Sequence, residues 1–162
     1  MIFLMTYDLN DSEEWTSYLE IYNEYIREVV TDKDELKEAI EHINSEDYHK
    51  DILKVVNRDN NKFNVCRIYN DDIFIGFCDY ICYKDENGKC LIGNFYLYEQ
   101  YRNHGYGTEV YNIMENSLLY LGGKYIDLTP APKAVSFYER KGFVKTKDLS
   151  LENGEIVYRK RL

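Results

Sequence analysis

Two strand-like segments joined by a tight turn constrain the fold more than any other part of this sequence. The first, DIFIGFCDYICY (72–83), is apolar on both faces and rich in β-branched and aromatic residues. That pattern is expected of a central strand covered on both sides. The second, CLIGNFYLY (90–98), follows after the link KDENGK, in which Asn87-Gly88 is a strong hairpin signal. The sequence therefore predicts a hairpin inside a sheet.

Helical and strand-like patterns alternate on either side of this hairpin. Before it, we expect a strand over residues 2–9, helices over 12–30, 31–43 and 45–56, and a strand over 62–69. After it, we expect a helix over 107–121, a strand over 124–130, a helix over 133–142 and a closing hairpin over 143–162. This order predicts an α/β protein with a mixed sheet, and a length of 162 residues suits one domain spanning 1–162.

The charge is unevenly distributed along the chain. The net charge is −9, which argues against nucleic acid as a bulk partner. Residues 1–60 hold 16 acids and 6 bases, whereas the remainder is nearly balanced. An acidic layer of this kind attracts cationic ligands, although a solvated helix face that aids solubility explains it equally simply.

The cysteines and the N-terminus point to an ordinary reduced, cytoplasmic protein. Cys66, Cys78, Cys82 and Cys90 form no CxxC pair and lie mostly within apolar runs, so we expect no metal site. The N-terminus lacks the basic region of a signal peptide. No apolar run approaches the roughly 20 residues of a membrane span, so no membrane association is expected.

The stretch QYRNHGYGT (100–108) lies between a predicted strand and a predicted helix, with the spacing Arg-x-x-Gly-x-Gly at Arg102, Gly105 and Gly107. A helix N-terminus presents unpaired N–H groups, and glycines let the backbone approach an anion closely. The stretch is therefore a candidate phosphate site. The alternative is a tight connection with a glycine near the helix cap. Neither a P-loop nor a dinucleotide fingerprint fits these residues.

Two segments together carry a resemblance to a known family. EQYRNHGYGTEVYN (99–112) resembles the acyl-CoA loop of the GNAT superfamily of N-acetyltransferases, and AVSFYERKGF (134–143) resembles a later motif of the same family. They occur in the family's order, with one helix and one strand between them. The resemblance covers residues 63–162 well and residues 1–60 in layout only. It implies the GNAT fold, a mixed, mostly antiparallel sheet of six to seven strands with helices on both faces.

The resemblance also implies a set of cofactor-binding positions. In this family the loop amides bind the pyrophosphate of coenzyme A, and the preceding strand offers backbone groups to the pantetheine arm and the acetyl carbonyl. The implied loop residues are Arg102, Asn103, His104, Gly105, Tyr106, Gly107 and Thr108, and the implied strand residues are Phe95, Leu97 and Tyr98. The side chains of these three strand residues have an equally good role in the core.

Two residues are candidates for the chemistry. Tyr138 takes the place of the tyrosine that protonates the departing thiolate in many family members, although it is also explained as a half-buried aromatic on a short helix. Asp79 lies in an otherwise apolar strand, where an unpaired charge is costly. It is therefore either a general base or a hydrogen-bonded structural residue. Glu99 and Asp127 are weaker candidates, and a chain of water molecules would serve an amine that is already partly deprotonated.

The sequence also departs from the family at two places. Ala131 stands where many members carry an Asn that contacts the cofactor, and CLIGNF (90–95) lacks the strand glutamate that some members use as a base. The resemblance implies direct transfer of an acetyl group from acetyl-CoA to a primary amine. The acidic first third favours a cationic acceptor, such as a polyamine, an aminoglycoside, a lysine side chain or a protein N-terminus. A non-catalytic acyl-CoA-binding or scaffolding module is the alternative, and a homodimer through the edge strands is left open.

Overall fold

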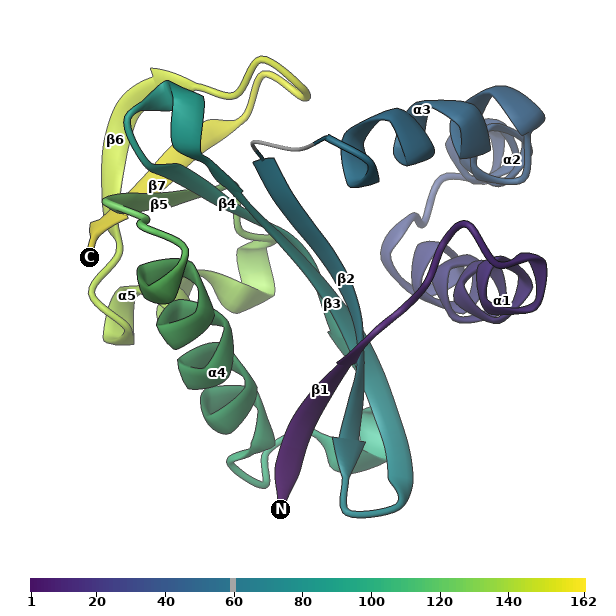
Figure 1. The fold of residues 1–162 in the computed structure, drawn as a ribbon, viewed down its shortest axis with the longest axis horizontal. Helices are drawn as coiled ribbons and strands as arrows, with labels where there is room; N and C mark the ends of the chain where they lie inside the picture. The colour runs from purple at the N-terminus through teal and green to yellow at the C-terminus, as the bar shows by residue number, and fades with distance from the viewer. Residues whose placement is uncertain (59–60) are drawn as a thin grey trace.

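In the computed structural model of the chain, residues 1–58 and 61–162 are described. The elements occur in the predicted order (Figure 1). They are β1 (Ile2–Thr6), α1 (Ser12–Val29), α2 (Lys33–Ile43), α3 (Glu46–Val56), β2 (Asn61–Asn70), β3 (Ile73–Tyr83), β4 (Lys89–Leu97), α4 (Tyr106–Tyr120), β5 (Tyr125–Leu128), α5 (Val135–Arg140), β6 (Val144–Leu149) and β7 (Ile156–Arg161), with the short 3-10 helices η1 (Lys84–Glu86), η2 (Glu99–Tyr101) and η3 (Pro132–Ala134).

The described strands form one sheet of seven, in the order β1-β2-β3-β4-β5-β7-β6. Every neighbouring pair is antiparallel except β4 and β5, which are parallel. The predicted turn between β3 and β4 is present, because Asn87 and Gly88 adopt positive φ angles of 55° and 76°. The expected mixed, mostly antiparallel sheet is therefore confirmed.

The three N-terminal helices begin at side-chain caps. Asp11 and Asp32 each accept hydrogen bonds from two backbone N–H groups of the following turn, and Ser45 accepts one from Tyr48. Acidic residues in each first turn also favour the positive end of the helix dipole. Local sequence therefore sets where α1, α2 and α3 start.

Helices cover both faces of the sheet, as Figure 1 shows, with α1 to α3 on one side and α4 and α5 on the other. The core beneath α4 and α5 contains Ile68, Met114, Leu118 and Ile126, together with all four cysteines. The core beneath α1 and α3 is richer in aromatic residues and includes Trp15, Tyr18, Phe77 and Tyr96. The sheet therefore separates two cores of different chemistry.

The β3–β4 pairing contains an irregularity. Cys78 pairs with Phe95 and Tyr80 pairs with Ile92, so that Gly93 and Asn94 both lie opposite the single residue Asp79. This arrangement is a β-bulge on β4, which bends a strand and re-aims its side chains. A Cβ atom on Gly93 would lie only 2.2 Å from an Asp79 carboxylate oxygen, so the bulge requires glycine there.

Among the described helices, none is both long enough and apolar enough to cross a membrane.

Candidate functional site

The two parallel strands at the centre of the sheet diverge along their length. β4 pairs with β5 at Lys89, Cys90 and Leu91 and then continues to Leu97. Beyond Leu128 the chain leaves β5 and passes through η3 into α5. Among the described residues, no strand therefore lies along the second half of β4 on the edge that faces away from β3. On this edge, the Leu97 carbonyl accepts a hydrogen bond from the Arg102 side chain.

Alternate residues of an antiparallel strand direct their N–H and C=O groups to the same neighbour. Tyr98 donates its N–H to the Ile75 carbonyl on β3, at 3.0 Å. Leu97 and Phe95, which are out of phase with Tyr98, therefore direct their backbone groups to the open edge. Of the three strand residues that the sequence suggests for backbone contacts, Phe95 and Leu97 direct their backbone groups to this edge, where the Leu97 carbonyl is bonded to Arg102. The N–H of Tyr98 is bonded to β3.

The predicted loop leads directly into α4. Asn103 and Gly105 have positive φ angles of 62° and 86°, and Gly105 is the N-cap residue of α4, where no described side chain caps the helix. The Thr108 and Glu109 N–H groups bond to the Gly105 carbonyl, at 3.0 and 3.3 Å. The preceding amides belong to the first turn, where a helix offers no internal acceptor. The loop thus has the backbone shape that an anion site requires.

The two basic side chains of the loop lie differently. Arg102 turns towards β4 and α1: its Nε donates to the Leu97 carbonyl at 2.8 Å, and its guanidinium forms an ion pair of 2.6 Å with Glu28. His104 is exposed; its Nδ1 lies 2.6 Å from the Arg102 carbonyl oxygen and its ring stacks on Tyr106. The positive charge of Arg102 is therefore already partnered.

Tyr138 lies on α5, next to Phe137, whose ring contacts Phe95 of β4. The Tyr138 ring is buried and packs edge-on against Tyr111, Phe137 and Phe143. Burial raises the pKa of the Tyr138 phenol, and interactions with Tyr25 and Cys78 raise it further. The Tyr138 hydroxyl therefore stays protonated at neutral pH.

Asp79 is buried on β3 opposite the bulge, which supplies its hydrogen-bond partners. One carboxylate oxygen accepts the Asn94 backbone N–H at 3.0 Å, and the other accepts the Asn94 side-chain amide at 2.6 Å. Burial raises the pKa of Asp79 to about 6, and the hydrogen bonds from Asn94 limit the rise. None of the ion pairs in the described parts of the chain includes Asp79. It is a buried acid whose charge has no cationic counterpart.

The surroundings of Asp79 are mostly aromatic. Side chains alternate along a strand, so Asp79 shares a face with Phe77, whose ring contacts Tyr18, Tyr22 and Tyr25 of α1. Burial and then the nearby Asp79 charge raise the pKa of Tyr48, on α3. Tyr22, Tyr25 and Tyr48 are only partly buried. All three rings pack against the core beneath α1 and α3 and remain partly exposed.

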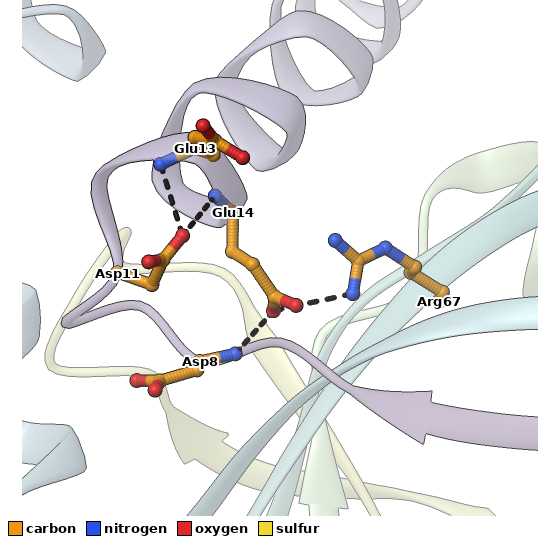
Figure 2. Close-up of a pocket in the computed structure, with 5 residues that line it drawn as sticks. All are labelled: Asp8, Asp11, Glu13, Glu14 and Arg67. Atoms are coloured by element: carbon orange, nitrogen blue, oxygen red, sulfur yellow. Dashed lines mark hydrogen bonds and ion pairs between the residues drawn. The ribbon is translucent and has the colours of Figure 1, made fainter.

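An acidic pocket lies between the end of β1 and the start of α1 (Figure 2). Its carboxylates serve the fold: Asp11 caps α1, and Glu14 accepts the Asp8 N–H at 2.6 Å and pairs with Arg67 at 3.2 Å. The Arg67 guanidinium also stacks over the Tyr7 ring at 3.8 Å. The pocket therefore stabilises the β1–α1 junction.

The weaker candidates for a base are less well placed. Asp127 is held by a bidentate ion pair with Arg159, at 2.6 and 2.8 Å, which joins β5 to β7. Glu99 lies in η2, where its carbonyl accepts the Arg102 N–H. Within the described residues, no group of three or more His, Cys, Asp or Glu side chains is arranged to hold a metal ion.

Comparison with known proteins decides the family. Residues 61–145, more than half of the chain, match the family model of the acetyltransferase (GNAT) domain. The chain belongs to the GNAT family of acetyltransferases. No curated protein sequence matches this GNAT acetyltransferase significantly.

Solved structures match the fold of this GNAT acetyltransferase at low sequence identity. The PaiA N-acetyltransferase of Thermoplasma acidophilum, solved in complex with coenzyme A, is 15% identical with a TM-score of 0.73, and the match covers 100% of this chain and 99% of that one. A GNAT-family acetyltransferase of Staphylococcus aureus is 18% identical with a TM-score of 0.64, covering 100% and 99%. Tetrahymena GCN5 is 14% identical with a TM-score of 0.63, covering 99% and 95%.

Two residues of the site in this GNAT acetyltransferase were missed by sequence reasoning. The first is Asn94, whose side-chain amide donates to the Asp79 carboxylate. The neighbouring Gly93 could have predicted the bulge, because an isolated glycine inside a strand often marks one. Glu28 contacts Arg102 across 74 positions of sequence. No local pattern predicts such a long-range ion pair.

Proposed function

We propose that the protein transfers an acetyl group from acetyl-CoA directly to a primary amine of a cationic acceptor. The observation that carries this proposal is the divergence of β4 from β5, beside which lie the start of α4 and the helix α5 that carries Tyr138: a Cβ on Gly107 would contact Phe137, Phe95 and Leu97. The family membership supplies the donor, and the loop backbone from Asn103 to Thr108 has the shape to hold its pyrophosphate.

The groups beside this divergence suit each step of the transfer. The acceptor nitrogen attacks the thioester carbonyl, forming a C–N bond and a tetrahedral oxyanion, and backbone N–H groups on the open edge of β4 are positioned to stabilise that oxyanion. The C–S bond then breaks, and the sulfur leaves as a thiolate. The Tyr138 phenol, which its raised pKa keeps protonated, donates the proton to the thiolate.

Asp79 is the proposed acceptor of the proton that the amine loses. An alkylammonium has a pKa of about 10.4 and cannot attack until it is deprotonated. A carboxylate with a pKa of about 6 is ionised at neutral pH and is a stronger base than an ordinary aspartate. Tyr25 interacts electrostatically with both Asp79 and Tyr138, which supports the assignment of both groups to one site.

The helices over Asp79 support a cationic acceptor. Tyr22, Tyr25 and Tyr48 present partly exposed rings, and aromatic faces attract ammonium groups. Glu20, Glu24 and Glu28 follow one another at intervals of four residues on α1. The pKa of Tyr98 is raised by burial and by Glu24 and Glu20, so this acidic row faces the end of β4. Such a row concentrates cations near the end of β4.

Calorimetry with acetyl-CoA, followed by measurement of free-thiol release across a panel of amines, tests the proposal. We expect saturable binding of acetyl-CoA and thiol release with at least one polyamine, aminoglycoside or short peptide. Absence of binding at millimolar acetyl-CoA would end the proposal. Binding without thiol release on any amine would instead support a non-catalytic acyl-CoA-binding module, an outcome consistent with Ala131 in place of the usual Asn.

A further inference from the structure

Arg102 makes contacts that do not fit a ligand for phosphate. Its Nε donates to the Leu97 carbonyl at 2.8 Å, and a terminal nitrogen lies 2.6 Å from the Glu28 carboxylate. The guanidinium carbon also lies 5.4 Å from the centre of the Tyr96 ring. These partners belong to β4 and α1, so the side chain spans two elements that belong to different parts of the sequence.

Glu28 is unusually placed for a helix residue. It is the penultimate residue of α1, where a negative charge opposes the negative end of the helix dipole. The Arg102 hydrogen bond is the largest influence on the Glu28 carboxyl and lowers its pKa, despite partial burial. The ion pair with Arg102 therefore stabilises the charged Glu28 carboxylate, which the dipole of α1 destabilises.

We propose that Arg102 is a positioning residue: pinned between Glu28 and the Leu97 carbonyl, it fastens the loop 99–105 to the end of β4 and to α1. The proposal rests on the proposed function in that this loop is taken to hold the cofactor. It assigns cofactor contact to the loop backbone and gives the Arg102 side chain a different task. It also joins the helix that lines the acceptor side to the loop that lines the cofactor side.

The contacts along the loop show why such a fastening matters. Within the loop, the Tyr101 and Arg102 N–H groups bond to the carbonyls of Tyr98 and Glu99, at 2.9 and 3.1 Å. These local bonds shape the turn without fixing it against the rest of the fold. Arg102 supplies the tie to α1 and β4, and the amide of Asn70 supplies another by donating to the Tyr106 hydroxyl at 3.2 Å.

The two possible roles of Arg102 predict opposite effects for one substitution. If Arg102 were a phosphate ligand restrained by Glu28, then Glu28→Gln would free the guanidinium and remove a nearby negative charge, and acetyl-CoA would bind more tightly. If Arg102 positions the loop, Glu28→Gln loosens the loop and acetyl-CoA binds more weakly. The pair is partly exposed, at 36% and 41% of the two side chains. The expected weakening is therefore modest, about three- to tenfold in the dissociation constant.

The experiment compares Glu28→Gln, Arg102→Gln and the double variant with wild type. Glu38→Gln is the matched control, because it removes the same charge from an exposed position on α2, outside the row formed by Glu20, Glu24 and Glu28. Two quantities are measured: hydrogen exchange of the loop amides without cofactor, and the acetyl-CoA dissociation constant by calorimetry. Melting curves verify that each variant is folded.

We expect faster loop exchange and weaker binding in Glu28→Gln and Arg102→Gln, a double variant no worse than Arg102→Gln, and a control close to wild type. Unchanged loop exchange in Glu28→Gln overturns the inference, and so does tighter acetyl-CoA binding. The exchange measurement needs no ligand. If wild type binds no acetyl-CoA, the proposed function fails, while loop exchange still decides whether Arg102 fastens the loop.

Discussion

The raised pKa of Asp79 gives the protein a pH-dependent stability that one substitution removes. The ordinary value of 3.8 rises to about 6 in the folded protein, mainly because burial disfavours the charged carboxylate. Protonated Asp79 carries no such penalty, so the native state loses stability as the pH rises from about 4 through 6. At 1.36 kcal/mol per pH unit, the full loss is roughly 3 kcal/mol at neutral pH.

Asp79→Asn removes the titrating group while keeping nearly the same shape. We therefore expect the free energy of unfolding of Asp79→Asn, relative to wild type, to increase by about 3 kcal/mol between pH 4 and pH 7.5. The altered contact with Asn94 also changes the free energy of unfolding of the variant, but by the same amount at every pH. Urea unfolding at intervals of one pH unit measures this difference directly. A difference that does not change with pH would refute the raised pKa, and with it the case for Asp79 as a poised base.

Asn94→Ala provides a second variant on the same reasoning. The hydrogen bonds from Asn94 lower the pKa of Asp79 and so offset part of the effect of burial. Loss of the side-chain amide should therefore raise the pKa of Asp79 further and move the pH-dependent loss of stability to higher pH. A shift to lower pH would show that Asn94 does not stabilise the charged carboxylate.

Three further substitutions test other parts of the site. Tyr138→Phe should lower kcat by about a hundredfold and leave the acetyl-CoA dissociation constant unchanged, because only proton donation is lost; steady-state kinetics and calorimetry separate the two effects. Gly105→Ala should destabilise the protein by about 1–2 kcal/mol and weaken acetyl-CoA binding, since the φ of 86° disfavours a side chain while no atom lies within 4 Å of the added Cβ. Gly76→Ala should cost roughly 1–3 kcal/mol or more in urea unfolding, because its Cβ would lie 2.1 Å from the Tyr96 carbonyl oxygen.

Periodicity and turn chemistry were enough to predict the arrangement of strands and helices. In the run from Asp72 to Tyr98, the Asn87-Gly88 pair predicted the hairpin turn. The loop glycines predicted an anion site because a strand was expected before them and a helix after them. These signals are local, so a single sequence contains them. The family motifs added the expectation of a mostly antiparallel sheet of six to seven strands with helices on both faces, which periodicity alone does not determine.

The partners within the site were harder to predict. Asp79 was identifiable as a charge in an apolar strand, but its hydrogen bonds to Asn94 depend on an extra residue in β4. Arg102 was expected to add charge at the phosphate loop, whereas its side chain pairs with Glu28 on a distant helix. Such contacts arise from the packing of separate elements, and propensities do not encode them.

The bulge at Gly93 and Asn94 also separates the local site from the two cores. Ile92 and Phe95 lie on the same face of the sheet although they are three positions apart, because Gly93 and Asn94 together lie opposite Asp79. Deleting one of these two residues would restore regular alternation and leave Phe95, Tyr96 and Leu97 on their present faces. Such a deletion should therefore spare both cores and disturb mainly the Asp79 carboxylate, whose two hydrogen bonds come from Asn94.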